Sequence, residues 1–149
     1  MKKIYLLTTL CLCMFTARLS ACDCGPAHSE KILDEKVYGG ENYVFFTAEV
    51  VSVEAAFHLE VTVLLKQVYL GSKFIKDQTK PVTVFFDLRT ACAIQEQINI
   101  KAGNVLFITS VYNTMGRMLI TNNCDAFFPA DQLATYQLLD YLESLKGLE

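Results

Sequence analysis

Alternating apolar and polar residues predict five β-strands in the middle of the chain. The clearest is YVFFTAEVVSV (43–53), in which Val44, Phe46, Ala48 and Val50 share one face, as in a half-buried strand. The others are LEVTVLLKQVYLG (59–71), PVTVFFDL (81–88), NVLFITSVY (104–112) and RMLITNN (117–123), with a turn around residues 113–116. The polar stretch before residue 81 is typical of a loop.

The second predicted strand changes its alternation partway along. Its apolar positions are odd-numbered from Val61 to Leu65 and even-numbered at Val68 and Leu70. A β-bulge near residues 65–67 would produce this slip and a sharp bend.

Helical patterns lie at both ends of this strand-rich region. Residues 27–38 predict a short surface helix that Ser29 caps. Near the C-terminus, Pro129 and Asp131 begin a second helix, which Gly147 ends. Its apolar stripe follows helical spacing at Ala134, Leu138, Tyr141 or Leu142, and Leu145.

Together these elements predict a mainly β protein. We expect an OB-fold-like, five-stranded Greek-key barrel with a short N-terminal helix and a C-terminal helix. Phenylalanine pairs at 45–46, 85–86 and 127–128 would fill the barrel. A β-sandwich with a peripheral helix is the competing architecture.

The first 21 residues have the layout of an export signal. Two lysines precede an apolar run that is shorter than the ~20 residues of a membrane-spanning helix, and small residues follow. We therefore expect a signal peptide at 1–21, a single domain at 22–149, and a secreted or extracytoplasmic location, either extracellular or periplasmic.

Removal of that signal makes the chain more acidic. Lys2, Lys3 and Arg18 leave, so 10 basic residues remain against 16 acidic ones and the net charge is −6. Nucleic acid is not expected as a partner, because phosphate recognition calls for a clustered basic face.

Four cysteines remain after residue 21, namely Cys22, Cys24, Cys92 and Cys124. An even number in an oxidising compartment favours two disulfides, for which three pairings exist. A soft-metal site formed by Cys22, Cys24 and His28 is an alternative, since thiolates and imidazole suit copper or zinc.

The chain lacks the motifs that would indicate an enzyme. It has no His-Glu-x-x-His motif, glycine-rich phosphate loop or Gly-x-Ser-x-Gly elbow. A nucleophilic pair of Cys22 or Cys24 with His28 would need a reduced thiol and an orienting group that is not evident. His58, at the start of a predicted strand, is interpreted as a solvated edge residue. We expect neither enzymatic activity nor a cofactor.

The spacing Cys-x-Cys-x-Pro-x-His at 22–28, with two distant cysteines and five barrel strands, resembles the N-terminal, netrin-like domain of the tissue inhibitors of metalloproteinases. The resemblance covers residues 22–149, including FFTAEV (45–50) and the turn after VYLG (68–71). It implies disulfides Cys22–Cys92 and Cys24–Cys124.

Three departures from the family pattern bear on function. Asp34 stands where the first cysteine of the family's third disulfide would be, and its partner is missing too. The sequence does not show the family's second domain. Asp23 replaces the small uncharged residue that vertebrate members carry between the two cysteines. The pattern is similar to single-domain members found outside vertebrates.

The resemblance implies inhibition of a zinc metalloproteinase by the mature N-terminus. The free amine and carbonyl oxygen of Cys22 would chelate the zinc ion of the protease, and the side chain of Asp23 would enter its first specificity pocket. Cys24 would anchor this short segment to the barrel.

A second interpretation starts from the same cysteine. Leu19-Ser20-Ala21-Cys22 also fits a bacterial lipobox. A lipidated Cys22 could neither chelate zinc nor pair with Cys92, and the chain would then be a non-inhibitory surface lipoprotein or extracellular binding module. A membrane is expected as a partner only in that case.

Overall fold

The computed structural model describes residues 29–55, 58–86, 100–122 and 125–148, so the predicted signal peptide lies outside the described residues. The described strands are β1 (Tyr43–Ala55), β2 (Leu59–Leu70), β3 (Val82–Phe86), β4 (Val105–Asn113), β5 (Met118–Thr121) and β6 (Phe127–Pro129). The described helices are α2 (Glu30–Tyr38), α4 (Gln132–Thr135) and α5 (Leu139–Leu145), and a 3-10 turn, η1 (Ser72–Phe74), follows β2.

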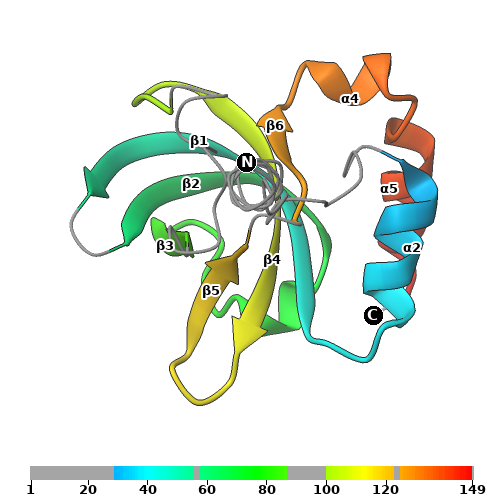
Figure 1. Ribbon diagram of the computed structural model, residues 1–149, viewed down its shortest axis with the longest axis horizontal. Coiled ribbons are helices and arrows are strands. Elements are labelled where there is room, and N and C mark those ends of the chain that lie inside the picture. The colour runs from blue at the N-terminus through cyan, green and yellow to red at the C-terminus, as the bar shows by residue number, and fades with distance from the viewer. Residues whose placement is uncertain (1–28, 56–57, 87–99, 123–124, 149) are drawn as a thin grey trace, which may run out of the picture.

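Five of these strands close into a barrel. Strand β1 pairs with β2 along one edge and with β4 along the other, while β3 and β5 join through a parallel pairing. The resulting order, β1-β2-β3-β5-β4 and back to β1, confirms the predicted OB-fold-like barrel rather than a sandwich (Figure 1). The short β6, which the alternation of the sequence did not reveal, adds to β4.

The bulge predicted in the second strand is present. Thr47 lies opposite Gln67 and Ala48 opposite Leu65, which leaves Lys66 as the extra residue. A further register shift between Phe45 and Phe46 follows closely. These irregularities let β2 bend with the barrel wall.

The apolar residues form two separate cores. The first fills the barrel and includes Val44, Phe46, Val61, Phe86, Ile108 and Phe127. The second lies between the barrel wall and the helices and includes Leu33, Phe45, Tyr69, Phe107, Phe128 and Leu142. The phenylalanine pairs therefore do not all fill the barrel as predicted, because the pairs at 45–46 and 127–128 are shared between the two cores.

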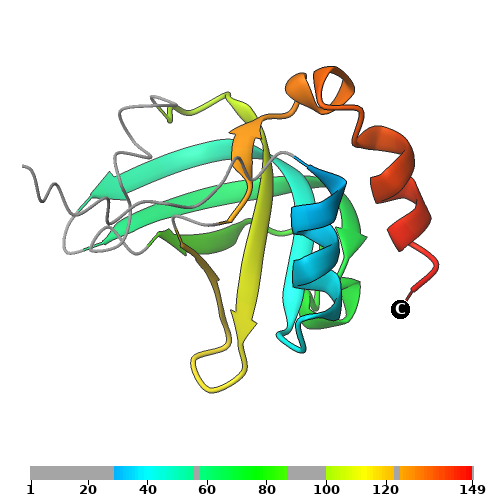
Figure 2. The same ribbon diagram turned by 45° about the vertical axis from the view of Figure 1, so that its right-hand side comes forward.

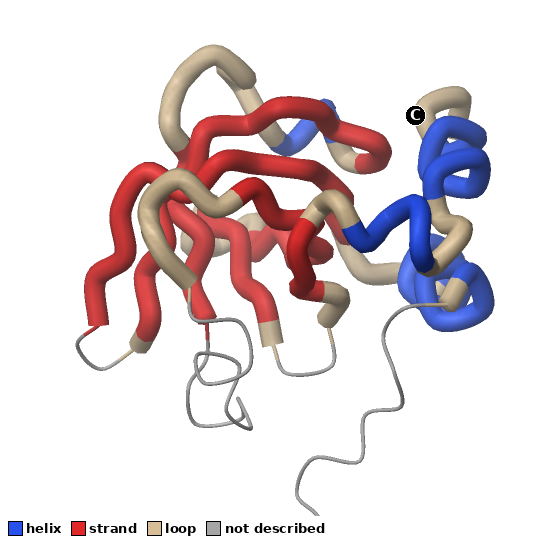
Figure 3. Tube along the Cα trace, turned by 90° about the horizontal axis from the view of Figure 1, so that it is seen from above, coloured by secondary structure: helices blue, strands red, loops and turns tan. Residues whose placement is uncertain are grey.

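Helices α2 and α5 lie side by side against one side of the barrel (Figures 1 and 2), and Figure 3 shows the helical segments gathered beside the strands. Ser29 occupies the N-cap position of α2 as predicted, but its side chain makes no capping hydrogen bond. Leu33 is the fully buried residue of α2, and the partly buried Val37 packs against the same second core.

The predicted C-terminal helix is divided into two. Gln137 has a φ of 57°, which breaks the helix after α4, and α5 begins afresh at Leu139. The break changes the phase of the apolar stripe: Leu133 is buried and Ala134 is exposed, so the prediction for Ala134 was wrong. The predicted contacts of Leu138, Leu142 and Leu145 are confirmed, since all three are buried in the second core.

Within the described part of the chain, no helix has the length and apolar composition needed to cross a membrane.

Candidate functional site

The residues on which the predicted site depends lie outside the described part of the chain. These are Cys22, Asp23, Cys24, His28, Cys92 and Cys124. The structure describes the chain up to Phe86 and again from Ile100 on either side of Cys92, and up to Asn122 and again from Asp125 on either side of Cys124.

Strands β3 and β5 lead toward Cys92 and Cys124, respectively, and they end next to each other. Because the two strands are parallel, both point to the same edge of the barrel. Phe86, the last residue of β3, pairs with Thr121, the last residue of β5. The two chain segments that carry the distant cysteines therefore leave the barrel from neighbouring positions.

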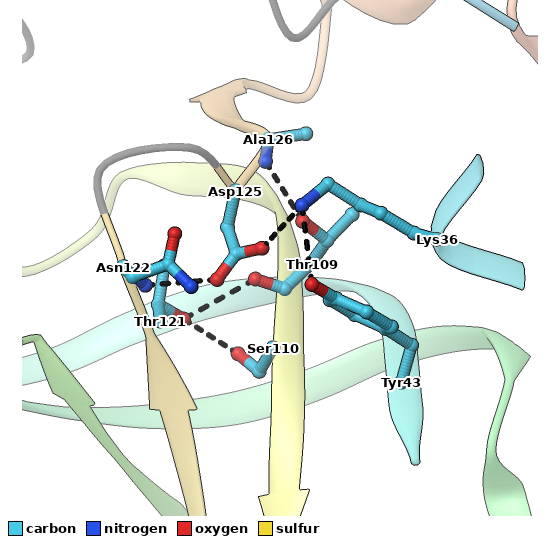
Figure 4. A network of polar contacts seen from close by, with 8 residues as sticks. All are labelled: Lys36, Tyr43, Thr109, Ser110, Thr121, Asn122, Asp125 and Ala126. Atoms are coloured by element: carbon cyan, nitrogen blue, oxygen red, sulfur yellow. Dashed lines mark hydrogen bonds and ion pairs between the residues drawn. The ribbon is translucent and has the colours of Figure 1, made fainter. Parts of the chain in front are cut away.

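Asn122 and Asp125, the described residues nearest to Cys124 in the chain, are bound to each other. The Asp125 N–H donates to the carbonyl oxygen of Asn122 at 3.1 Å, and the Asn122 N–H donates to Asp125 Oδ2 at 2.8 Å. Ala126 then donates its N–H to Thr109 Oγ1 at 2.7 Å and accepts the Thr109 N–H at 2.9 Å. Ala126 is thus fixed to β4 (Figure 4).

A buried ion pair links the same stretch to the first described helix. Lys36 Nζ of α2 lies 2.6 Å from Asp125 Oδ1, with side-chain exposures of 11% and 0%. The Lys36 ammonium also donates to the Tyr43 hydroxyl at 3.3 Å and lies 4.8 Å from the centre of its ring (Figure 4). We call Lys36, Tyr43 and Asp125 the buried polar cluster.

Burial controls the protonation of this cluster. Removal from water raises the pKa of the Asp125 carboxyl above its usual value, against the opposing effects of the Asn122 N–H and of Lys36. Burial, together with the negative charge of Asp125, also raises the pKa of Tyr43. The phenol therefore stays protonated at neutral pH, and the cluster serves to hold elements together rather than to supply a nucleophile.

Side-chain hydroxyl groups of β4 and β5 form a further set of buried polar contacts. Thr121 donates to the carbonyl oxygen of Thr109 at 3.3 Å, which leaves Ser110 as the donor in its 2.6 Å contact with Thr121. All three residues are fully buried. Each side chain is satisfied by a protein partner, so this group is best explained as structural.

Asp34 has a partner of its own, although the family's third disulfide has no counterpart in the sequence. It accepts a 2.6 Å hydrogen bond from the Tyr141 hydroxyl of α5. This bond joins α2 to α5, and burial and the Asp34 carboxylate raise the pKa of Tyr141. A reversible polar contact thus connects the two helices at this position.

The buried polar cluster was not predicted from the sequence. Lys36 follows the buried Leu33 by three residues, which places both on one face of a helix, and Asp125 directly precedes the apolar residues 126–128. A charge on the apolar face of a helix was the signal that could have revealed the pair.

His58 is exposed and makes an edge contact with the Phe85 ring, at a centroid separation of 6.2 Å, as expected of a residue at the edge of the barrel. Across the described ranges, no group of three or more histidine, cysteine, aspartate or glutamate side chains could hold a metal ion. The soft-metal alternative at Cys22, Cys24 and His28 lies outside those ranges.

No model of a known protein family matches the chain, and no curated protein matches its sequence at a significant level. A functional assignment for this chain therefore depends on its fold and its own residues.

Proposed function

We propose that the chain is an exported, inhibitor-like protein that chelates the active-site zinc of a metalloproteinase through a mature N-terminus at Cys22. The observation that supports the proposal most directly is the pairing of Phe86 with Thr121 in a closed OB-like barrel. Chain segments leading to Cys92 and Cys124 start side by side there, which suits two bonds to neighbouring cysteines in one short N-terminal segment.

The chemistry requires a free amine at Cys22. An α-amino group has a pKa near 8, so a fraction is neutral at pH 7 and can donate a lone pair. Together with the Cys22 carbonyl oxygen it would form a five-membered chelate at the open position of the protease zinc and displace the catalytic water.

Two disulfides would pre-organise this segment. A chain terminus is normally poorly ordered, and ordering it on binding reduces affinity. Bonds Cys22–Cys92 and Cys24–Cys124 would remove that freedom before the protease is encountered.

The proposal is tested by an inhibition titration against a panel of zinc metalloproteinases, after intact mass has established an unmodified N-terminal Cys22. A matched control retains Ala21, which blocks the amine of Cys22 and leaves the barrel unchanged. Inhibition by the mature protein and its loss in the control support the proposal. Failure of the mature protein to inhibit any enzyme in the panel, both with Asp23 and with the Asp23→Thr substitution, contradicts it.

The lipobox at 19–22 supports a second candidate, a surface lipoprotein whose barrel is a non-inhibitory binding module. A diacylglycerol mass on Cys22 would select this function over inhibition, because a lipidated cysteine normally has an acylated amine.

A further inference from the structure

A groove of about 290 Å³ lies where the loop before β3 meets the turn between β4 and β5. Its walls are mainly apolar and aromatic, and they include Phe74, Val82, Phe85, Tyr112, Met118 and Leu119. The rings of Phe74 and Tyr112 are stacked there, with their centroids 4.9 Å apart. This volume and lining are typical of a site for a small molecule, since a hollow of this size admits a ring or a short chain.

Two cations line the same groove at one end. Lys76 lies in the loop before β3 and Arg117 directly precedes β5, so both lie where these parallel strands begin. Both side chains are exposed, and neither is paired with a carboxylate of the described residues. Phe85 lies further along β3, opposite Glu60 of β2. The groove therefore has a cationic end and an aromatic end.

The surroundings of the cationic end add to its positive charge. Asp77 is the one carboxylate among the described lining residues, and it is bound to the Thr79 hydroxyl at 2.6 Å and to Lys80 at 3.1 Å. The Lys73 ammonium lies 5.3 Å from the centre of the Phe74 ring. Four cations thus gather around one carboxylate, although the predicted mature chain has a net charge of −6. This local charge favours an anionic ligand.

The backbone of Arg117 makes the choice of residue informative. Its φ is 52°, a conformation that glycine or asparagine adopts at lower cost than arginine does. The turn is already held by Asn113, whose Oδ1 accepts the N–H groups of Met115 and Gly116 at 3.0 Å each. An arginine is thus not needed to form the turn, and its presence is better explained by what its guanidinium can bind.

We propose that this groove binds a small aryl carboxylate. The Arg117 guanidinium can donate two parallel hydrogen bonds to a carboxylate, and Lys76 adds a second positive charge. The ring of the ligand then packs in the aromatic part of the groove, against Phe85 and the Phe74–Tyr112 stack. A bare anion would leave these apolar walls uncovered. The groove lies at the starts of β3 and β5, whereas the predicted inhibitory segment is joined to the chain beyond their other ends.

The test titrates 4-phenylbutyrate into the mature protein and follows backbone amide signals by NMR. We expect saturable shifts at Phe74, Thr83 and Phe85, with half-saturation below about 5 mM. Arg117→Asn should weaken binding at least about fivefold and Lys76→Gln about threefold, because each removes a charged hydrogen-bond donor. The urea midpoint of Arg117→Asn should be unchanged or higher, since asparagine tolerates the positive φ.

The neutral alcohol 4-phenylbutanol and the ringless anion acetate are the matched ligands, and each should bind at least about fivefold more weakly. Lys101→Gln is the matched protein control, because Lys101 is exposed and lies before β4, at the other end of that strand from Tyr112. Equal binding of either matched ligand would overturn the proposal, as would shifts outside the groove or unchanged affinity in both groove variants. So would self-association that Arg117→Asn abolishes, because the occupant would then be a second copy. If Arg117→Asn does not fold, Lys76→Gln decides. Failure to inhibit a protease would leave this measurement intact.

Discussion

Phe86 of β3 and Thr121 of β5 are paired residues at the ends of two parallel strands. The pairing is supported from inside the barrel, where the Phe86 ring makes an edge contact with Phe127 at a centroid separation of 4.7 Å. It is also supported by Thr121, whose hydroxyl is buried against Ser110. Both anchors hold the ends of β3 and β5 together at one edge of the barrel.

We predict Cys22–Cys92 and Cys24–Cys124 bonds in the mature protein, the pairing that the resemblance to the tissue inhibitors of metalloproteinases implies. Peptide mapping under non-reducing conditions measures the pairing directly. Detection of a Cys22–Cys24 bond, or of a free Cys92, would contradict the prediction.

Asp23 is expected to limit potency. In the proposed docking its carboxylate enters the first specificity pocket of the protease, and burying an unpaired charge in an apolar pocket costs several kcal/mol, with about tenfold in affinity lost for every 1.4 kcal/mol. We predict weak or no inhibition of apolar-pocket metalloproteinases by the wild type and stronger inhibition by Asp23→Thr or Asp23→Ser. Titrations with matched N-termini check this, and tight wild-type inhibition that the substitutions do not improve would show that the docking is wrong.

The second core predicts a contrast within one helix. Leu142 of α5 is fully buried, whereas Leu139 of the same helix is 43% exposed. We expect Leu142→Ala to lower the free energy of unfolding by about 2–5 kcal/mol, and Leu139→Ala to lower it by less than about 1 kcal/mol. Urea unfolding of both variants measures the difference, and equal losses would mean that α5 does not pack as described.

The contact between Tyr141 and Asp34 should make a small, separable contribution. Removing one hydroxyl in Tyr141→Phe should cost about 0.5–1.5 kcal/mol, because the bond exchanges with hydrogen bonds to water in the unfolded chain. A double-mutant cycle with Asp34→Ala isolates this energy. A coupling energy of zero would contradict a role for the bond in joining the two helices.

Asp125 should give stability a recognisable pH dependence. Its pKa in the folded state is raised above the ordinary value of 3.8, so the folded protein binds the proton more tightly than the unfolded chain does. Its contribution is therefore fully present below pH 3.8 and is lost as the pH rises through the folded-state pKa. The unfolding free energy of the wild type minus that of Asp125→Asn should fall over this interval in urea titrations, and a difference that rises would contradict the sign.

Much of the barrel could be predicted from the sequence because its strands follow a simple alternation. The odd-to-even slip after Leu65 corresponds to the extra residue Lys66, so even a local irregularity was readable. Strand β6 was missed because three residues ending in Pro129 are too short to show a period. The helix break was missed because glutamine seldom adopts the positive φ found at Gln137, and nothing in its side chain indicates it.

The candidate site was less accessible to prediction. Cysteine spacing identified the residues that matter most to the proposed function. Only cysteine forms disulfides, so the positions of these residues can be read directly from the sequence. The pairing of Lys36 with Asp125 depends on how α2 packs against the stretch after β5, across 89 residues of sequence. Charges are common on surfaces, so their identity alone does not reveal which two of them become buried together.

The closure of β1 onto β4 also affects how this chain behaves at high concentration. Up to Val50, the edge of β1 that does not pair with β2 is hydrogen-bonded to β4 or to residues 103–104. Beyond that point the edge carries a register irregularity between Val50 and Ser52, and then Glu54. Irregular spacing and an exposed charge both discourage a second copy from adding a strand, so the free edge of β1 next to its connection with β2 is protected against edge-to-edge aggregation.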